Sequence, residues 1–230
     1  ELILHQHNTR GSLIIESAIV NNPGNPFFTN TLSLTKTGRG KVILLSDNGY
    51  SGQTSILDGV LQLGGLSYST GRIPTTPIIN NGYLSLRHTS TPTEYDYTDI
   101  HGSGAVRVES QAVQVLSGAN STYSGGTYVV SGTLRVNNNT QAGGTGLGST
   151  AGLTSVAPSG TLEVGTTNFR MNEVVYLRGG TLAGVNGATL LGSVLVGATS
   201  SLRSNTTGQN LTFSAPVITR PGANLTLSGL

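Results

Sequence analysis

Two short stretches of nearly identical sequence decide how this chain folds: residues 132–136 read GTLRV and residues 160–164 read GTLEV. In both stretches apolar Leu and Val alternate with polar residues, which is the period-two pattern of a β-strand with one buried face. The leading Gly allows the tight turn that brings the chain into the strand. A unit of this length is too short to bury its own apolar face, so we expect successive copies to stack on one another.

The same pattern recurs along the whole chain at an average spacing of about 24 residues. Each copy has a small residue followed, two and four positions later, by a residue that is usually apolar. The first of these positions is always aliphatic: Leu13, Leu32, Leu61, Leu84, Val106, Leu134, Leu162, Leu182, Leu202 and Leu225. The second holds Ile15, Leu34, Leu63, Leu86, Val108, Val136, Val164, Gly184, Ser204 and Leu227. We predict that these two columns form inward-facing ladders of Leu and Val.

The composition supports short strands and turns over helices. Only 10% of the residues are charged and 33 of 230 are Gly, against about 25% charged residues and about 7% Gly in ordinary domains. There is no Cys, which excludes a disulfide framework and a thiolate metal site. The 12 basic residues form no run, so we expect no nucleic-acid partner. No stretch approaches the ~20 apolar residues of a transmembrane segment.

These observations predict an all-β fold, a right-handed parallel β-helix (solenoid) of about ten coils with ~20–28 residues each. The prediction treats residues 1–230 as a single domain. The alternatives are an antiparallel sandwich and a propeller. Propeller blades need about 40–50 residues and a repeated aromatic signature, which this chain lacks. Because the chain starts at Glu1 without a signal segment and ends within a strand-like pattern, we interpret it as a processed product or a fragment of a longer surface protein.

Part of the chain resembles a known bacterial repeat. The first copy comprises residues 34–42 (LTKTGRGKV), 48–54 (NGYSGQT) and 56–63 (ILDGVLQL). These residues resemble the autotransporter-associated β-strand repeat, which is found in passenger regions of bacterial surface and secreted proteins.

A second copy comprises residues 102–106 (GSGAV), 120–127 (NSTYSGGT) and 129–136 (VVSGTLRV). It departs from the first copy in two ways. Ile100 stands where the first copy has Lys36, and the second copy has nine more residues before its Tyr. We expect the extra residues to form a loop or a partial coil.

The resemblance implies a β-helical passenger stalk that is exported and displayed outside the cell, at the bacterial cell surface or in the extracellular medium. It implies no catalysis, because the repeat is a scaffold shared by proteins of different activity. We therefore expect a protein that is not an enzyme and needs no cofactor, and we assign no catalytic residue and no metal site.

The densest group of polar side chains lies at residues 87–101, which we predict to be a loop insertion between coils. Its candidate binding residues are His88, Glu94, Tyr95, Asp96, Tyr97, Asp99 and His101. The favoured interpretation is a solvated loop that collects the charges excluded from the coils. Three alternatives remain open: carboxylates at i, i+2 and i+5 that bind calcium, Tyr95 and Tyr97 stacking on sugar rings beside Asp96 and Asp99, and a carboxylate pair for glycoside hydrolysis.

Three charged residues, Arg107, Arg135 and Glu163, occupy consecutive copies of the polar position between the two apolar columns. Stacked coils would place Arg135 next to Glu163. An exposed pair of this kind contributes only about 0–1 kcal/mol. We interpret these residues as a surface ladder without a specific function.

Three functional hypotheses follow. The first is a non-enzymatic, adhesin-like surface stalk that displays loops to a host or matrix glycan or protein. The second is a subunit of an extracellular filament or matrix that self-associates by end-to-end β-pairing, since residues 2–4 and 225–227 are apolar and provide no polar cap. The third is a polysaccharide-binding or polysaccharide-cleaving β-helix that uses residues 87–101.

Overall fold

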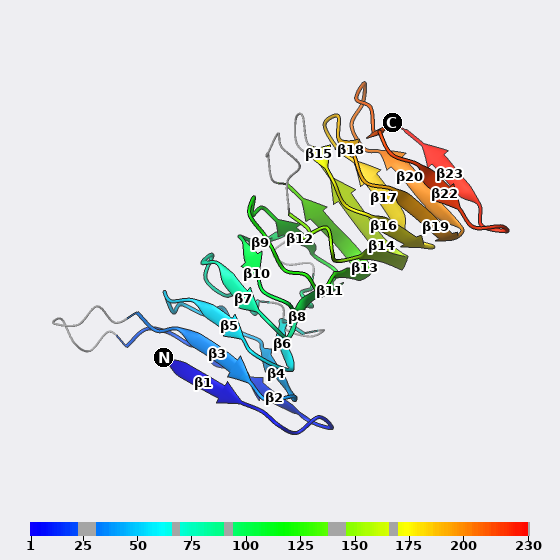
Figure 1. Cartoon of the computed structure of the whole chain (residues 1–230). Helices are drawn as coiled ribbons and strands as arrows, with labels where there is room; N and C mark the ends of the chain where they lie inside the picture. The colour runs from blue at the N-terminus through cyan, green and yellow to red at the C-terminus, as the bar shows by residue number, and fades with distance from the viewer. Residues whose placement is uncertain (23–30, 66–69, 90–93, 138–145, 166–169, 230) are drawn as a thin grey trace.

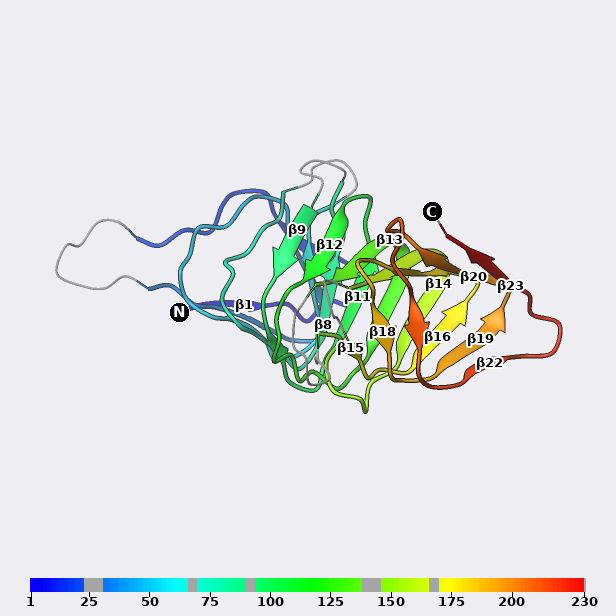
Figure 2. The same cartoon turned by 90° about the horizontal axis from the view of Figure 1, so that it is seen from above.

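A computed structural model describes residues 1–22, 31–65, 70–89, 94–137, 146–165 and 170–229. In these residues the chain forms short β-strands joined by turns, and it contains no α-helix. The strands stack rung upon rung from the N-terminal to the C-terminal coil, which makes an elongated molecule (Figures 1 and 2). No helix among the described residues is long and apolar enough to span a membrane. The predicted all-β solenoid is confirmed.

Every pair of neighbouring strands is parallel, as a solenoid requires. We call the longest series of paired strands the long row. It runs through β2 (Ser12–Ile15), β4 (Lys41–Leu44), β6 (Val60–Leu63), β8 (Tyr83–Leu86), β11 (Ala105–Glu109), β13 (Thr127–Val136), β14 (Thr154–Val164), β16 (Val175–Arg178), β19 (Val194–Ala198) and β22 (Val217–Thr219).

The remaining strands form the other sides of the coils. A five-stranded sheet holds β1 (Leu2–His5), β3 (Leu34–Thr37), β5 (Thr54–Ile56), β7 (Ile78–Asn80) and β10 (Ile100–His101). What we call the side row joins the second halves of β13 and β14 to β9 (Glu94–Tyr97), β12 (Val113–Leu116), β17 (Thr181–Gly184), β20 (Ser200–Ser204) and β23 (Leu225–Ser228). A three-stranded sheet holds β15 (Arg170–Met171), β18 (Thr189–Leu190) and β21 (Thr212–Phe213).

The predicted aliphatic ladders exist within each row. In the long row Leu61 pairs with Leu84 and Leu84 with Val106. In the side row Leu134, Leu162, Leu182 and Leu202 pair in succession. All of these residues are buried in one continuous hydrophobic core.

The prediction that one column runs through the whole chain is wrong. Val106 pairs with Thr127 of the long row, whereas Leu134 belongs to the side row. Leu34 lies in the five-stranded sheet, and Leu202 pairs with Leu227 instead of Leu225. The physical reason is that each coil contains several strands with the same alternation. The pattern therefore identifies strands but does not say which side of the coil each one occupies.

The loop predicted at residues 87–101 is also wrong for the part that is described. Residues 94–97 form β9, which pairs with β12, and residues 100–101 form β10, which pairs with β7. Residues 90–93 lie outside the described residues. The extra residues of the second repeat copy carry β12, so they form part of a coil. The right-handed winding, the number of coils and the single-domain organisation stay predictions.

Each repeat copy has a buried tyrosine shortly before a strand: Tyr50 precedes β5 of the five-stranded sheet, and Tyr123 precedes β13 of the long row. The Tyr50 hydroxyl lies 2.6 Å from Thr54 Oγ1, and the Tyr123 hydroxyl lies 2.6 Å from Thr127 Oγ1. Both tyrosines are almost fully buried, so each hydroxyl needs the partner that the threonine four residues later supplies. Burial raises the pKa of Tyr50 to about 12, although the bond to Thr54 lowers it. This bond explains the Tyr-Ser-Gly-x-Thr spacing.

The close approach of the coils makes Gly132 a sensitive position. Its φ is +79°, and a Cβ there would clash with the carbonyl oxygen of Ser110, whereas Gly208 has φ +71° and no atom within 4 Å of a Cβ. We expect Gly208→Ala to cost about 1–2 kcal/mol of unfolding free energy through backbone strain alone. Gly132→Ala should cost about 2 kcal/mol more, because the coils must also move apart. Urea unfolding measures both, and equal costs would contradict this account.

Candidate functional site

The seven residues predicted to form one binding site divide between the core and the surface. On β9, Tyr95 and Tyr97 point inward and are 2% and 4% exposed, while Glu94 and Asp96 point outward. This is the alternation of a strand in a solenoid wall. The structure therefore does not bring the seven side chains together around one ligand.

Tyr95 is enclosed in a stack of planar groups. The His88 ring lies parallel to it at a centroid distance of 3.8 Å, and the Arg72 guanidinium carbon lies over it at 5.1 Å. Because Tyr95 is only 2% exposed, it has no free face on which a sugar ring could stack. Through this contact the Tyr95 ring packs Arg72 against β9.

His88 has a structural role in the same stack. Its Nδ1 lies 3.0 Å from Gln114 Oε1, and Gln114 Nε2 donates to Ser110 Oγ and to the Ala112 carbonyl. Since the Gln114 amide nitrogen is used as a donor, Gln114 Oε1 accepts and His88 Nδ1 carries the proton. Burial lowers the pKa of His88 to about 4, although the Gln114 bond raises it.

Asp99 and His101 make contacts between coils. Asp99 Oδ1 accepts a hydrogen bond from the Asn120 backbone N–H at 2.8 Å, and His101 Nδ1 lies 2.9 Å from Thr122 Oγ1. Among the described residues no three His, Cys, Asp or Glu side chains lie close enough to hold a metal ion. The calcium hypothesis therefore has no described ligand set.

A cavity of about 230 Å³ lies beside β9. It is lined by Arg72, Ile73, Thr75 and the four residues of β9. No atom of the described residues forms a hydrogen bond with the buried Tyr97 hydroxyl. Asp99 does not line this cavity, so the carboxylate pair proposed for sugar binding or hydrolysis is not assembled there.

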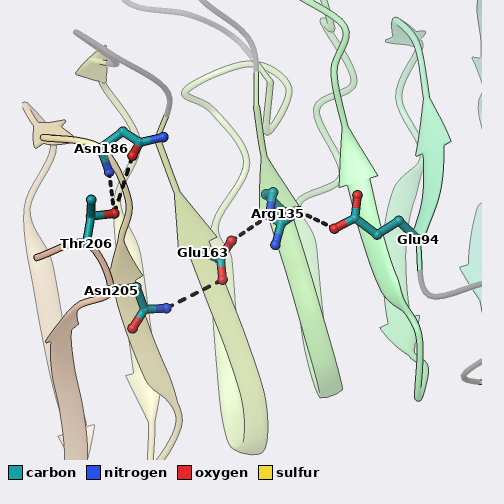
Figure 3. Close-up of polar contacts among 6 residues, drawn as sticks. All are labelled: Glu94, Arg135, Glu163, Asn186, Asn205 and Thr206. Carbon is teal, nitrogen blue, oxygen red and sulfur yellow. Dashed lines mark hydrogen bonds and ion pairs between the residues drawn. The ribbon is translucent and has the colours of Figure 1, made fainter. Parts of the chain in front are cut away.

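The outer surface of the side row carries a ladder of polar contacts (Figure 3). Arg135 Nε lies 2.5 Å from Glu163 Oε1, which confirms the predicted pair, and Arg135 Nη1 also contacts Glu94. Glu163 Oε2 accepts a weak hydrogen bond from Asn205 at 3.5 Å. Arg107 is not in this ladder, contrary to prediction: it lies in the long row and pairs with Glu109 of its own strand.

Sequence reasoning missed Glu173, a carboxyl group inside the core. It is 4% exposed, and Thr154 Oγ1 lies 3.3 Å from its Oε1. Burial raises the pKa of Glu173 to about 8, although the Thr154 hydrogen bond lowers it. One signal was available in the sequence: Glu173 has the same parity as the inward-facing Val175 and Leu177 of β16.

His88 should make the fold sensitive to acid. Because its pKa is about 4 in the folded protein and 6.5 otherwise, the unfolded chain binds this proton more readily. The contribution of His88 to the free energy of unfolding is full above pH 6.5 and is lost as the pH falls through about 4. The loss in unfolding free energy is about 2–3 kcal/mol. Urea unfolding between pH 7 and pH 4 should show a smaller acid-induced loss for His88→Gln. An identical loss in the variant would contradict this prediction.

Glu173 should act in the opposite direction. Its pKa is 4.5 without burial and about 8 in the folded state, so its contribution is full below pH 4.5 and is lost as the pH rises through 8. The loss is on the order of 4 kcal/mol. We expect Glu173→Gln to unfold at higher urea concentration than the unmodified protein at pH 8.5, whereas the exposed control Glu16→Gln should not. A lower midpoint for Glu173→Gln at pH 8.5 would refute the assignment.

Comparison with known proteins supports the repeat. A family model described as passenger-associated-transport-repeat matches residues 34–63 and 112–136. The first match runs from β3 to β6 and the second reaches from β12 through β13, and each contains its buried tyrosine. No curated protein and no solved structure matches the chain.

This repeat family is typically structural, and it implies a protein that is secreted or lies at the cell surface. The repeat and the β-solenoid together fit an autotransporter passenger domain. The two matched segments, which lie within a parallel solenoid, are therefore similar to the autotransporter passenger β-helix repeat.

Proposed function

We propose that this chain is a non-enzymatic, adhesin-like stalk of a surface-exposed passenger, whose outer faces are presented to the surroundings of the cell. The observation that carries the proposal is the unbroken long row of parallel strands from β2 to β22, to which both matched segments contribute strands. Such a row makes a rod, because each coil contacts only its neighbours.

The site geometry supports a scaffold more than an enzyme. Of the seven predicted binding residues, Tyr95, Tyr97 and His88 are buried in the wall, and Asp99 and His101 join neighbouring coils. Glu94 contacts Arg135. These contacts stabilise the stack, and Asp99 does not line the cavity beside β9.

Surface display can be tested on intact cells that produce the full-length protein with a short epitope inserted at Gly208. That glycine has no neighbouring atom within 4 Å of a Cβ, so an insertion there should not disturb the stack. We expect antibody binding, or proteolytic loss of the epitope, on intact cells or in the culture medium. A periplasmic protein serves as the intactness control. Epitope detection only after permeabilisation would refute display.

A filament is the second candidate, because the strands of both end coils pair on one side only: β1 and β2 at one end, β22 and β23 at the other. Ile3 and Leu227 on these strands are 57% and 73% exposed. In a longer chain further coils would cover the same edges. Electron microscopy of the purified full-length protein distinguishes the two arrangements. Fibres that grow with concentration support the filament, and separate rods of constant length refute it.

A further inference from the structure

One outer face of the solenoid carries an unassigned group of tyrosines and arginines. On β11, β16 and the first half of β13, buried residues alternate with more exposed, outward-facing ones. On β8 the outward-facing Ser85 is buried as well, whereas Tyr83 is half-buried. The aromatic and basic residues at the outward positions are Tyr83, Arg87, Arg107, Tyr128, Tyr176 and Arg178. We call these six residues the tyrosine–arginine strip.

The aromatic rings of the strip lie across neighbouring coils. Tyr83 and Tyr128 are stacked with a centroid distance of 6.3 Å and an angle of 19° between the rings. Arg107 lies on β11, between the strands that carry them. Ser155 pairs with both Tyr128 and Tyr176 and is buried, whereas the two tyrosines are half-buried.

The Tyr176 ring, at the end of the strip, packs against a glycine of the neighbouring strand. The ring lies against Gly197 of β19, where any side chain would collide with it. The Arg178 guanidinium carbon lies over the same ring at 5.1 Å from its centroid. Gly197 is therefore a positioning residue that lets the aromatic ring lie against the sheet.

The charge of the strip is not balanced within the face. Apart from the second halves of β13 and β14, which belong to the side row, the outward positions of these described strands, with Arg87 directly after β8, hold three arginines and one acid, Glu109. Glu109 is already paired with Arg107, which lowers its pKa. On the side row, by contrast, Arg135 lies between Glu94 and Glu163, so that charge is neutralised by the protein itself (Figure 3).

We propose that the tyrosine–arginine strip binds an acidic polysaccharide that lies along the solenoid axis. Guanidinium groups pair in a bidentate manner with carboxylates and sulfates, and tyrosine rings provide apolar faces with a polar tip. Four rung spacings of about 4.8 Å give a strip about 19 Å long, enough for several sugar residues. Three arginines are few for a nucleic acid, because such contacts typically neutralise about 6–10 phosphates.

The proposal is tested with the purified protein, so its outcome does not depend on where the protein is displayed. The probes are heparin for sulfated chains, polygalacturonate for carboxylated chains, and neutral dextran. We expect at least one of the two acidic polymers to bind and dextran not to bind. The double variant Arg107→Gln with Arg178→Gln should weaken binding about tenfold or more. Arg203→Gln, which removes one positive charge from an exposed position on the side row, is the control.

The aromatic part of the strip has its own test, which separates a polysaccharide from any other polyanion. Tyr176→Leu and Gly197→Val should each weaken binding of the acidic polysaccharide severalfold, with thermal melting checked for both. Gly197→Val keeps the Tyr176 ring but fills the space against the sheet in which the ring lies. The proposal is overturned if neither acidic polymer binds, or if Arg203→Gln weakens binding as much as the arginine double variant does. It is also overturned if polyphosphate or double-stranded DNA binds more tightly than the acidic polysaccharides and Tyr176→Leu and Gly197→Val leave that binding unchanged.

Discussion

Backbone pairing between successive parallel coils is the interaction on which this structure depends. Each coil is too short to enclose its apolar residues, so Leu134, Leu162 and Leu182 are buried only because each one lies between neighbours one rung away. The same pairing holds like positions about 4.8 Å apart along each row. Repulsion between like charges at that spacing is consistent with the low charged fraction of 10%.

The corners of the coils solve a different problem, because backbone groups that leave the strands still need hydrogen-bond partners. Buried tyrosines bond to threonines at the corners before β5 and β13. At another, the buried Lys36 ammonium donates to the carbonyl oxygens of Thr37, Gly38 and Asp58. Burial lowers the pKa of Lys36, although Asp58 raises it. These polar groups define where each coil turns, while the ladders supply the burial.

The outer faces of the solenoid differ in how their charges are used. On the side row Arg135 lies between two glutamates. Its charge is neutralised within the protein, where such a network contributes to stability. On the long row the arginines outnumber the acids and lie among tyrosines. A repetitive scaffold can therefore carry a neutralised wall and a basic, aromatic wall on the same coils, since outward residues do not affect the inward ladders.

The sequence alone identified the strands that carry the repeated aliphatic pattern and their inward side chains, because period-two alternation with aliphatic residues is a local property of the chain. It also determined the two repeat copies and the Arg135–Glu163 pair, which lie within one row. It did not determine the site. The charges of Glu94 and Asp96 obscured a strand whose inward residues are Tyr95 and Tyr97.

Only the tertiary structure decided which row each strand joins, because several strands of a coil share one pattern and differ only in their partners. That choice separated Arg107 from Arg135 and placed Leu134 beneath a different wall from Val106. It also enclosed Tyr95 between His88 and Arg72 and brought Tyr83 to Tyr128. The partners in contacts of this kind depend on how the coils turn.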